Sequence, residues 1–246
     1  MIWFLHGAVG QAGDWDEVSQ SLAKGGVKSR SVDLWRFLEC EGMSLEEWAR
    51  SFNAEVKAAG EDQNIIVGYS MGGRLALHAL MADPELWDRA VIISAHPGLQ
   101  DEHERLDRMA QDAEWAAKAL AAEWPRFIEL WEGQAVLQQA GEEEENTAWN
   151  ERRGRLVNRR RAIARSFMEW SLGKQQDLRP KLAEVACPVL WLAGERDDKF
   201  VALAKESVAL LVKGDLQILP AAGHRLPFER TEDFQSSLKC FCEEDL

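Results

Sequence analysis

One serine of this 246-residue chain has a sequence context that could make it reactive. Ser70 is the centre of a Gly-x-Ser-x-Gly motif at 68–72, which joins a β-branched run at 65–67 to an apolar helical pattern at 75–81. A serine on a tight turn between strand and helix is exposed at the end of the strand, and the glycines leave room for that turn. The motif is also compatible with a serine that merely caps a helix.

A nucleophilic serine needs an imidazole to take its proton and a carboxylate to orient the imidazole. His224 follows the last predicted strand, and the neighbours Asp197 and Asp198 follow the strand before it. The order Ser, Asp, His is the one that a strand–serine–helix turn requires. Spacing from the strand end favours Asp197, although sequence alone does not separate the two carboxylates. His224 could instead be an ordinary loop histidine held by backbone groups.

Two backbone N–H groups are predicted to form an oxyanion hole. The N–H of Met71 lies at the start of the helix after Ser70, and that of Ala8 follows the His-Gly pair at 6–7, which ends the first predicted strand. Backbone donors in these two places stabilise negative charge that develops beside such a serine. The alternative for the His-Gly pair is a simple strand-ending turn.

The arginines differ in what their positions imply. Arg74 follows Ser70 by one helical turn, which places a guanidinium near the reaction centre. Because a guanidinium fork suits carboxylates, a small-molecule polycarboxylate is the natural substrate class. The arginines at 159–161 are more simply explained as a solvated face that balances the glutamates at 142–145.

The elements that must position these residues alternate along the chain. Strands are predicted at 2–5, 27–34, 65–69, 90–94, 189–193 and 216–219, and helices at 14–22, 44–59, 75–81, 201–211 and from 231. This alternation predicts an α/β fold with a mostly parallel sheet of about six strands, flanked by helices and joined by right-handed crossovers. Ligands bind at the carboxyl ends of such strands, where Ser70, His96, Asp197 and His224 all fall.

The pattern changes between about 100 and 175, where strand-like runs disappear and helical periodicity dominates. Short helices with apolar faces are expected there, lined by Trp115, Leu120, Trp124, Phe127, Ile128 and Trp131. We expect residues 1–99 and 176–246 to form the core, and residues 100–175 to be a helical cap, or lid, inserted over its working edge. A helical subdomain without a part in function is the alternative.

Composition excludes several classes of function. The formal net charge of −13 disfavours nucleic acid and anionic membranes as partners, because phosphate binding needs a basic surface. No run is long enough to cross a bilayer, and the first residues do not resemble a signal peptide, so a cytoplasmic protein is expected. The four cysteines, at 40, 187, 240 and 242, form no metal pattern and are interpreted as reduced thiols. The oligomeric state is left open; a monomer is compatible.

Taken together, these motifs resemble the α/β-hydrolase fold superfamily over nearly the whole chain. Within it, the chain resembles the 2-succinyl-6-hydroxy-2,4-cyclohexadiene-1-carboxylate synthases, which are lyases of menaquinone biosynthesis. The more particular segments are His-Pro-Gly-Leu at 96–99, the spaced arginines that follow it, and Gly-Glu-Arg-Asp-Asp-Lys-Phe at 194–200.

The resemblance implies roles for individual residues. Ser70, Asp197 and His224 would form the triad, and the substrate pocket would be lined by Tyr69, Arg74, Arg108, Trp131 and Arg155. The implied reaction is elimination of pyruvate, in which Ser70 activated by His224 removes a proton and the enol of pyruvate leaves. Neither a metal nor an organic cofactor is implied.

Two further functions remain open at this point. A serine carboxylesterase or thioesterase would use the same residues through an acyl-Ser70 intermediate. A non-catalytic binding protein that keeps the fold is the third reading, against which the presence of Ser70, Asp197 and His224 counts.

Overall fold

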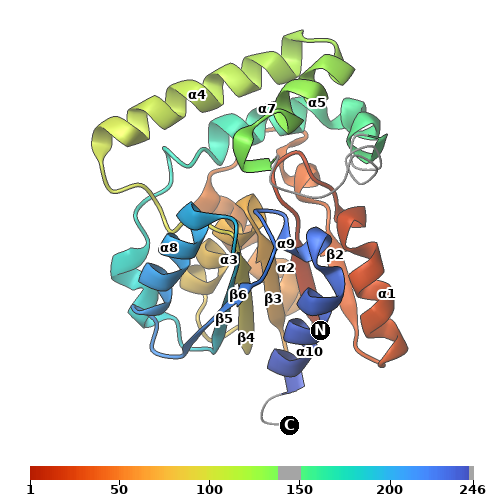
Figure 1. Ribbon diagram of the computed structural model, residues 1–246, viewed down its shortest axis with the longest axis vertical. Coiled ribbons are helices and arrows are strands. Elements are labelled where there is room, and N and C mark those ends of the chain that lie inside the picture. Colours follow the sequence, from red (N-terminus) through yellow and green to blue (C-terminus); the bar gives the residue numbers. More distant parts are fainter. Residues whose placement is uncertain (138–150, 244–246) are drawn as a thin grey trace.

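The computed structural model describes residues 1–137 and 151–243, which fold around one parallel sheet (Figure 1). The sheet has six strands in the order β2-β1-β3-β4-β5-β6. Their bounds are β1 (Ile2–Leu5), β2 (Ser29–Val32), β3 (Ile65–Tyr69), β4 (Arg89–Ile93), β5 (Val189–Gly194) and β6 (Gly214–Leu219). The predicted α/β fold with a parallel sheet of about six strands is confirmed, and all these strands end at the same edge.

Side chains alternate between the two faces of the sheet, as the twofold repeat of a strand requires. On one face, Trp3, Ile66 and Trp191 pack in a core with helices α2 (Leu45–Ala59), α3 (Met71–Ala82) and α8 (Asp198–Val208). On the other face, Phe4 and Val67 pack with helices α1 (Asp16–Lys24) and α10 (Thr231–Glu243). Helices therefore cover both faces, and the central strands β1, β3, β4 and β5 are almost entirely buried.

The first crossover illustrates how local sequence sets the helix bounds. Ser44 caps α2 by accepting a hydrogen bond from the backbone of Glu47, whose carboxylate accepts one from the Ser44 backbone in return. The two residues form a capping box, which satisfies backbone groups at the start of the helix. Gly60 ends the helix with a φ of 66°, a conformation that costs glycine little.

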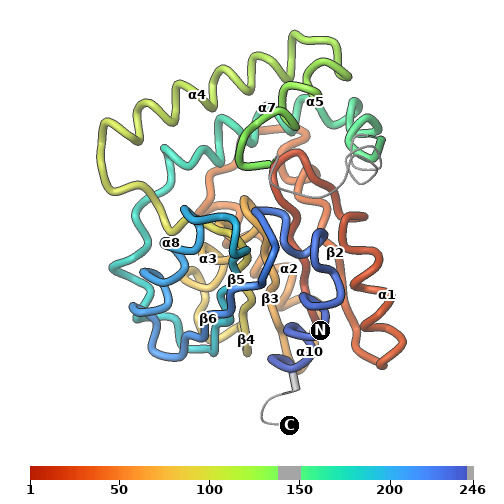
Figure 2. The backbone as a smooth tube through the Cα atoms, in the orientation of Figure 1, coloured from red at the N-terminus to blue at the C-terminus, as the bar shows by residue number. Residues whose placement is uncertain are grey.

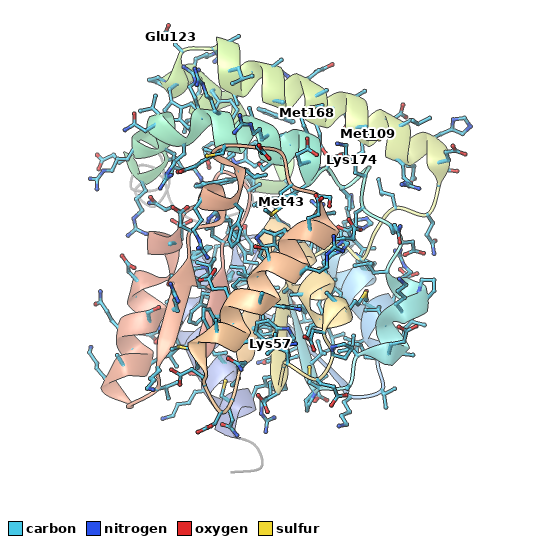
Figure 3. All side chains as sticks on the ribbon, turned by 180° about the vertical axis from the view of Figure 1, so that it is seen from behind. Met43, Lys57, Met109, Glu123, Met168 and Lys174 are labelled. Carbon is cyan, nitrogen blue, oxygen red and sulfur yellow. The ribbon has the colours of Figure 1, made fainter. Side chains whose placement is uncertain are left out.

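Three helices form a layer across the carboxyl edge of the sheet: α4 (Glu102–Ala121), α5 (Trp124–Glu132) and α7 (Arg160–Glu169) (Figure 1). Seen from behind, Met109 and Met168 lie in this layer, whereas Lys57 lies on α2 over the sheet (Figure 3). The expectation of short helices is wrong for α4, which runs for 20 residues and packs along α7. The expectation for Leu120 is also wrong, because its side chain is 53% exposed; Trp124, Phe127, Ile128 and Trp131 are buried as expected.

The chain enters and leaves this helical layer at one place. It rises to α4 after β4 and descends from α7 toward β5 on the same side of the molecule (Figure 2). There the N–H of Leu178 donates to the carbonyl of Pro97, at 2.8 Å, and Arg179 donates from Nη1 to the carbonyl of Gly98, at 2.8 Å. Since β4 and β5 are neighbours in the sheet, the two ends of the segment are held side by side.

Several shorter elements complete the chain. One-turn helices occur at Ala12–Trp15, Leu34–Leu38, Ala135–Leu137, Arg155–Arg159 and Arg179–Glu184, and α9 spans Leu226–Glu229. The predicted helix at 14–22 divides into the first of these and α1, and α8 begins three residues earlier than the expected Val201. No helix in the described ranges is both long and apolar enough to cross a membrane.

Candidate active site

Ser70 lies on the turn between β3 and α3, with a φ of 52° and a ψ of −112°. A positive φ is strained for a residue with a Cβ, and it turns the side chain away from the sheet. The flanking glycines are sterically required. A Cβ on Gly68 would lie 2.4 Å from the carbonyl oxygen of Gly72, and one on Gly72 would lie 2.4 Å from that of Leu5. The sequence motif thus folds as the predicted strand–serine–helix turn.

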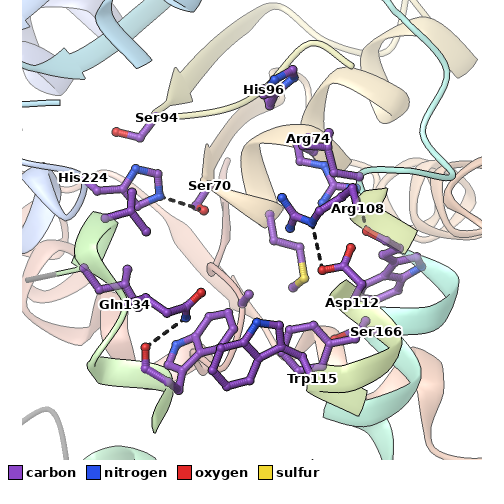
Figure 4. A pocket seen from close by; sticks show the side chains of 18 of the residues that line it. Ser70, Arg74, Ser94, His96, Arg108, Asp112, Trp115, Gln134, Ser166 and His224 are labelled. Atoms are coloured by element: carbon purple, nitrogen blue, oxygen red, sulfur yellow. Dashed lines mark hydrogen bonds and ion pairs between the residues drawn. The ribbon is translucent and has the colours of Figure 1, made fainter. Parts of the chain in front are cut away.

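The structure brings His224 and Asp197 to this serine. Nε2 of His224 lies 3.1 Å from Oγ of Ser70 (Figure 4), and Nδ1 lies 2.7 Å from Oδ2 of Asp197. Because the carboxylate accepts a hydrogen bond from Nδ1–H, Nε2 of the imidazole presents its lone pair to the serine hydroxyl. This arrangement can take the serine proton. Asp198, the alternative carboxylate, is exposed as the first residue of α8.

Close backbone packing holds the two loops that carry the carboxylate and the imidazole. A Cβ on Gly194 would lie 2.2 Å from the carbonyl oxygen of Gly223, so the loops touch at glycine. The N–H of Arg196 also donates to the carbonyl of Ala222, at 2.8 Å. The ring of Phe200 packs 4.5 Å, centroid to centroid, from the ring of His224 and fixes its plane.

Ala8 and Met71, the predicted oxyanion donors, both line the cavity that contains Ser70. The loop around Ala8 is held from below by His6, whose Nε2 accepts from the N–H of Leu34 and whose Nδ1 lies 2.9 Å from the carbonyl of Gly7. Burial lowers the pKa of His6 to about 4, so this ring is neutral and structural. Val9, which follows Ala8, has a positive φ of 53°, a strained conformation for a residue with a Cβ.

The cavity over Ser70 has a volume of about 270 Å³. One wall is apolar and aromatic and comes from the helical layer: Trp115, Trp131, Leu137, Phe167 and Trp170. Polar lining residues come both from the loops of the sheet, with Ser94, His96 and Lys199, and from α4, with Arg108, Gln111 and Asp112. A site of this kind suits a small ligand with an apolar body and a few polar groups.

Arg74 projects into this cavity from α3. Its Nε donates to Oε1 of Gln175, at 2.6 Å, and its Nη2 to the carbonyl of Trp170, at 2.6 Å. Among the described residues no carboxylate forms an ion pair with it. Burial, and to a lesser degree the nearby cation Arg108, lowers the pKa of Arg74 to about 9. A buried guanidinium in this state favours an anionic ligand.

The other predicted pocket residues are placed unequally. Tyr69, Arg108 and Trp131 line the cavity. Nε of Arg108 is 2.9 Å from Oδ1 of Asp112, whose Oδ2 accepts from the hydroxyl of Ser171, at 2.7 Å. Burial raises the pKa of Tyr69 well above its usual range, so its hydroxyl stays protonated.

Arg155 does not line the cavity of Ser70. It is exposed and borders a separate hollow, whereas Arg153 lies in the wall of the Ser70 cavity. Arg153 is 5% exposed, pairs with Glu132 at 2.9 Å, and donates from Nε to the carbonyl of Val9 at 3.1 Å. The sequence reasoning missed Arg153, because three arginines crowd into 152–155 and the pattern does not show which one turns inward.

Lys199 and His96 also line the cavity and received no role in the sequence reasoning. Both had a signal: His96 follows a predicted strand, and Lys199 lies in the segment 194–200. The described residues contain no group of three or more His, Cys, Asp or Glu side chains that could hold a metal ion.

Known proteins resemble this chain along its whole length. A model of the alpha/beta hydrolase family matches residues 4–235. The putative 2-succinyl-6-hydroxy-2,4-cyclohexadiene-1-carboxylate synthase of Haemophilus influenzae is 30% identical over 97% of this chain and 95% of its own length. The 2-succinyl-6-hydroxy-2,4-cyclohexadiene-1-carboxylate synthase of Serratia proteamaculans is 27% identical over 98% of this chain and 92% of its own. The solved structure of MenH from S. aureus superposes with a TM-score of 0.88 at 22% identity, over 99% of this chain and 93% of that one.

Proposed function

The chain belongs to the alpha/beta hydrolase family, and from that premise we propose that it is a carbon–oxygen lyase that eliminates pyruvate from a succinyl-enolpyruvyl-cyclohexene carboxylate. Relatives that match it nearly end to end carry the name of the corresponding synthase of menaquinone biosynthesis. The observation that carries the proposal is the pairing of a serine–imidazole–carboxylate array with Arg74, a buried guanidinium beside it that has no ion-pair partner among the described residues.

In the proposed reaction, His224 accepts the proton of Ser70 while Asp197 stabilises the imidazolium. The serine oxygen then removes a proton from a substrate carbon. The electron pair of that C–H bond forms a carbon–carbon double bond, the adjacent C–O bond breaks, and the enolate of pyruvate leaves. His224 then gives its proton to the departing enolate, and protonation of that enolate on carbon yields pyruvate.

The N–H groups of Ala8 and Met71 are proposed to stabilise the negative charge that develops during this step. Preorganised donors are effective because they need no reorientation when the charge appears. Arg74 and Arg108 would hold substrate carboxylates, and Tyr69 and Trp131 would contact the ring. Arg153 takes the place we had assigned to Arg155, because it lies in the cavity wall.

We propose that residues 100–175 act as the cap of this site, over the core formed by 1–99 and 176–246. The aromatic side chains of α4, α5 and α7 supply the apolar wall of the cavity, so the segment shields the reacting groups from water. A cytoplasmic location is part of the proposal, and free thiols at the four cysteines are compatible with it.

The direct test measures release of pyruvate from the succinyl-enolpyruvyl precursor. Lactate dehydrogenase reduces the released pyruvate, and the accompanying oxidation of NADH is monitored. Wild-type protein is expected to turn over and Ser70→Ala to lose at least about 10³-fold in kcat, because the proton acceptor is gone. Ser236→Ala, an exposed serine on α10, is the matched control and should leave the rate unchanged. Absence of pyruvate, or equal release by Ser70→Ala, would remove the proposal.

The same three residues could instead support acyl transfer, since a serine hydroxyl 3.1 Å from an imidazole nitrogen is also the starting point for an acyl-enzyme. A serine carboxylesterase or thioesterase would give a burst with p-nitrophenyl esters, and Ser70 would gain the acyl mass. The lyase proposal expects neither the burst nor a covalent adduct during turnover of the precursor.

A further inference from the structure

The ring of His96 lines the cavity, and its contacts determine which of its two nitrogens carries the proton. It lies two residues after a strained residue, Ser94, whose φ is 46° at the end of β4. Nδ1 of His96 is 3.0 Å from the N–H of Gly98 and must accept from it. An imidazole that accepts at Nδ1 and is neutral carries its proton on Nε2. The local turn therefore fixes the tautomer.

The Nε2–H of His96 has no hydrogen-bond partner among the described residues, and the ring lines the cavity. The charged groups around the ring are cations: Lys199, Arg179, Arg74 and Arg108. Burial, together with these cations, lowers the pKa of His96 to about 3. The ring stays uncharged at neutral pH, and its Nε2–H is a directional donor without a charge.

A single glutamine joins His96 to Arg74. Gln175 is fully buried; its Oε1 accepts from Nε of Arg74, at 2.6 Å, and its Nε2 donates to the carbonyl of His96, at 3.0 Å. Nε of Arg74 donates to Gln175, and Nη2 donates to the carbonyl of Trp170. Nη1 of Arg74 has no hydrogen-bond partner among the described residues. Figure 4 shows the side chains of His96 and Arg74 on the same side of the cavity.

We propose that His96 Nε2 and Arg74 Nη1 together form one carboxylate subsite, in which the arginine supplies the charge and the histidine a second, uncharged donor. Gln175 is the positioning residue that fixes both. A carboxylate has two oxygens that each accept hydrogen bonds, so two converging donors bind it better than one. This subsite adds a specific carboxylate contact to the proposed function. It rests on the proposed function only for the identity of the natural ligand.

The test compares two replacements of His96. His96→Gln keeps an uncharged N–H donor and an amide oxygen that can accept from Gly98, whereas His96→Phe fills the space without a donor. Succinate is the probe, and its dissociation constant is measured by ligand-observed NMR at pH 7.5. His103→Phe, an exposed histidine on α4, is the matched control.

We expect His96→Phe to weaken succinate binding about 10-fold or more, because a hydrogen bond to a charged group is lost. His96→Gln should recover most of this loss, and His103→Phe should change nothing. With the succinyl-enolpyruvyl precursor, His96→Phe should raise KM more than it lowers kcat. Thermal unfolding of each variant separates loss of the donor from loss of the fold.

The subsite is overturned if wild-type protein does not bind succinate, or if folded His96→Phe binds it as wild type does. If folded His96→Gln and folded His96→Phe bind succinate equally weakly, the proposal is also overturned, because the N–H donor would then make no difference to binding. If the succinate series behaves as expected but no pyruvate is released from the precursor, the proposed function fails and the carboxylate subsite stands.

Discussion

Nε of Arg153 donates to the carbonyl oxygen of Val9 across 3.1 Å, and so joins the chain that enters α7 to the loop after β1. Arg153 also pairs with Glu132, at 2.9 Å, and Glu132 pairs with Arg225, the neighbour of His224. Arg153 and Arg225 are almost completely buried, and the side chain of Glu132 is 13% exposed. One chain of charged contacts therefore connects the loop of Ala8, the end of α5 and the loop of His224.

Replacing Arg153 by Met should destabilise the protein and slow the reaction together. Breaking a buried ion pair costs about 3 kcal/mol, since Glu132 loses one of its two guanidinium partners. The Val9 carbonyl also loses its donor, which loosens the neighbouring Ala8. Urea unfolding and kcat are the measurements, with Arg126→Met, in an exposed pair on α5, expected to change stability by no more than about 0.5 kcal/mol. Unchanged stability of Arg153→Met would contradict this account.

Asp197→Asn should lower kcat by roughly 10³-fold to 10⁴-fold, with little change in stability. An amide can donate to Nδ1 of His224, which would favour the tautomer that has its proton facing Ser70 and cannot act as a base. Asp198→Asn is the matched control, because Asp198 is exposed and one residue away. Steady-state kcat values for the two variants test which carboxylate orients His224. A comparable loss of kcat in Asp198→Asn would mean that the carboxylate has been assigned wrongly.

Gly194→Ala should separate the loops of Asp197 and His224. The new Cβ would meet the carbonyl oxygens of Gly223 and Ala222 at 2.2 and 2.5 Å, so the backbone has to move. We expect a lower Tm and at least about a 10²-fold lower kcat, since a shift of 1 Å in a catalytic group has that effect. Gly154→Ala, where nothing lies within 4 Å of the new Cβ, should retain both properties.

Arg74→Lys should weaken substrate binding about 10-fold to 100-fold, seen as a higher KM. A lysine keeps the charge but cannot bond Gln175 and a carboxylate at once in the geometry of a guanidinium fork. The control is Arg105→Lys, because Arg105 only donates to the carbonyl of Gly173 and does not line the cavity. Equal KM values for the two variants would argue against a carboxylate bound at Arg74.

Stability should fall as the pH drops below about 6.5. Burial lowers the pKa of His6 to about 4, and the pKa values of His78 and His96 to about 3, from 6.5. Between pH 6.5 and about 4 the unfolded chain therefore binds more protons than the folded one, and acid favours unfolding. Each histidine contributes a slope of roughly 1.4 kcal/mol per pH unit in this range, and none above it.

His78→Leu tests this pH dependence, because Nε2 of His78 is buried without a hydrogen-bond partner among the described residues. The variant should lose about a third of the histidine contribution to the slope of unfolding free energy between pH 6.5 and 4.5, measured by urea titration. His103→Leu, at an exposed position, should leave the slope intact. A slope unchanged in His78→Leu would count against the lowered pKa.

Much of the fold could be predicted because its signals are local. The strand, the glycines and the helix around Ser70 are contiguous, and Ser44 and Glu47 form their capping box within four residues. The parallel sheet of about six strands followed from the alternation of strands and helices, whereas the order of the strands was not predicted. The length of α4 and the exposure of its Leu120 were not predicted. Leu120 is exposed and Ala116 is buried, but both are apolar, and the spacing of apolar residues alone does not show which of them faces the core.

The site was predictable to the extent that topology brings strand ends together. That argument places Ser70, Asp197 and His224 at one edge, but it cannot determine which of several adjacent side chains turns inward. Arg153 and Arg155 differ by two residues at the start of a one-turn helix, and only tertiary packing selects the buried one. The tautomer of His96 depends on a bond to Gly98 that no residue pattern announces.

The two ends of the segment between β4 and β5 meet where Leu178 bonds to Pro97, so both chain connections of the cavity roof to the sheet lie side by side. Since β4 and β5 pair directly with each other, the length of the roof can change without altering their register. Side chains of the roof also bond to the core, as Arg153 does to the carbonyl of Val9, so any such change has to preserve these contacts.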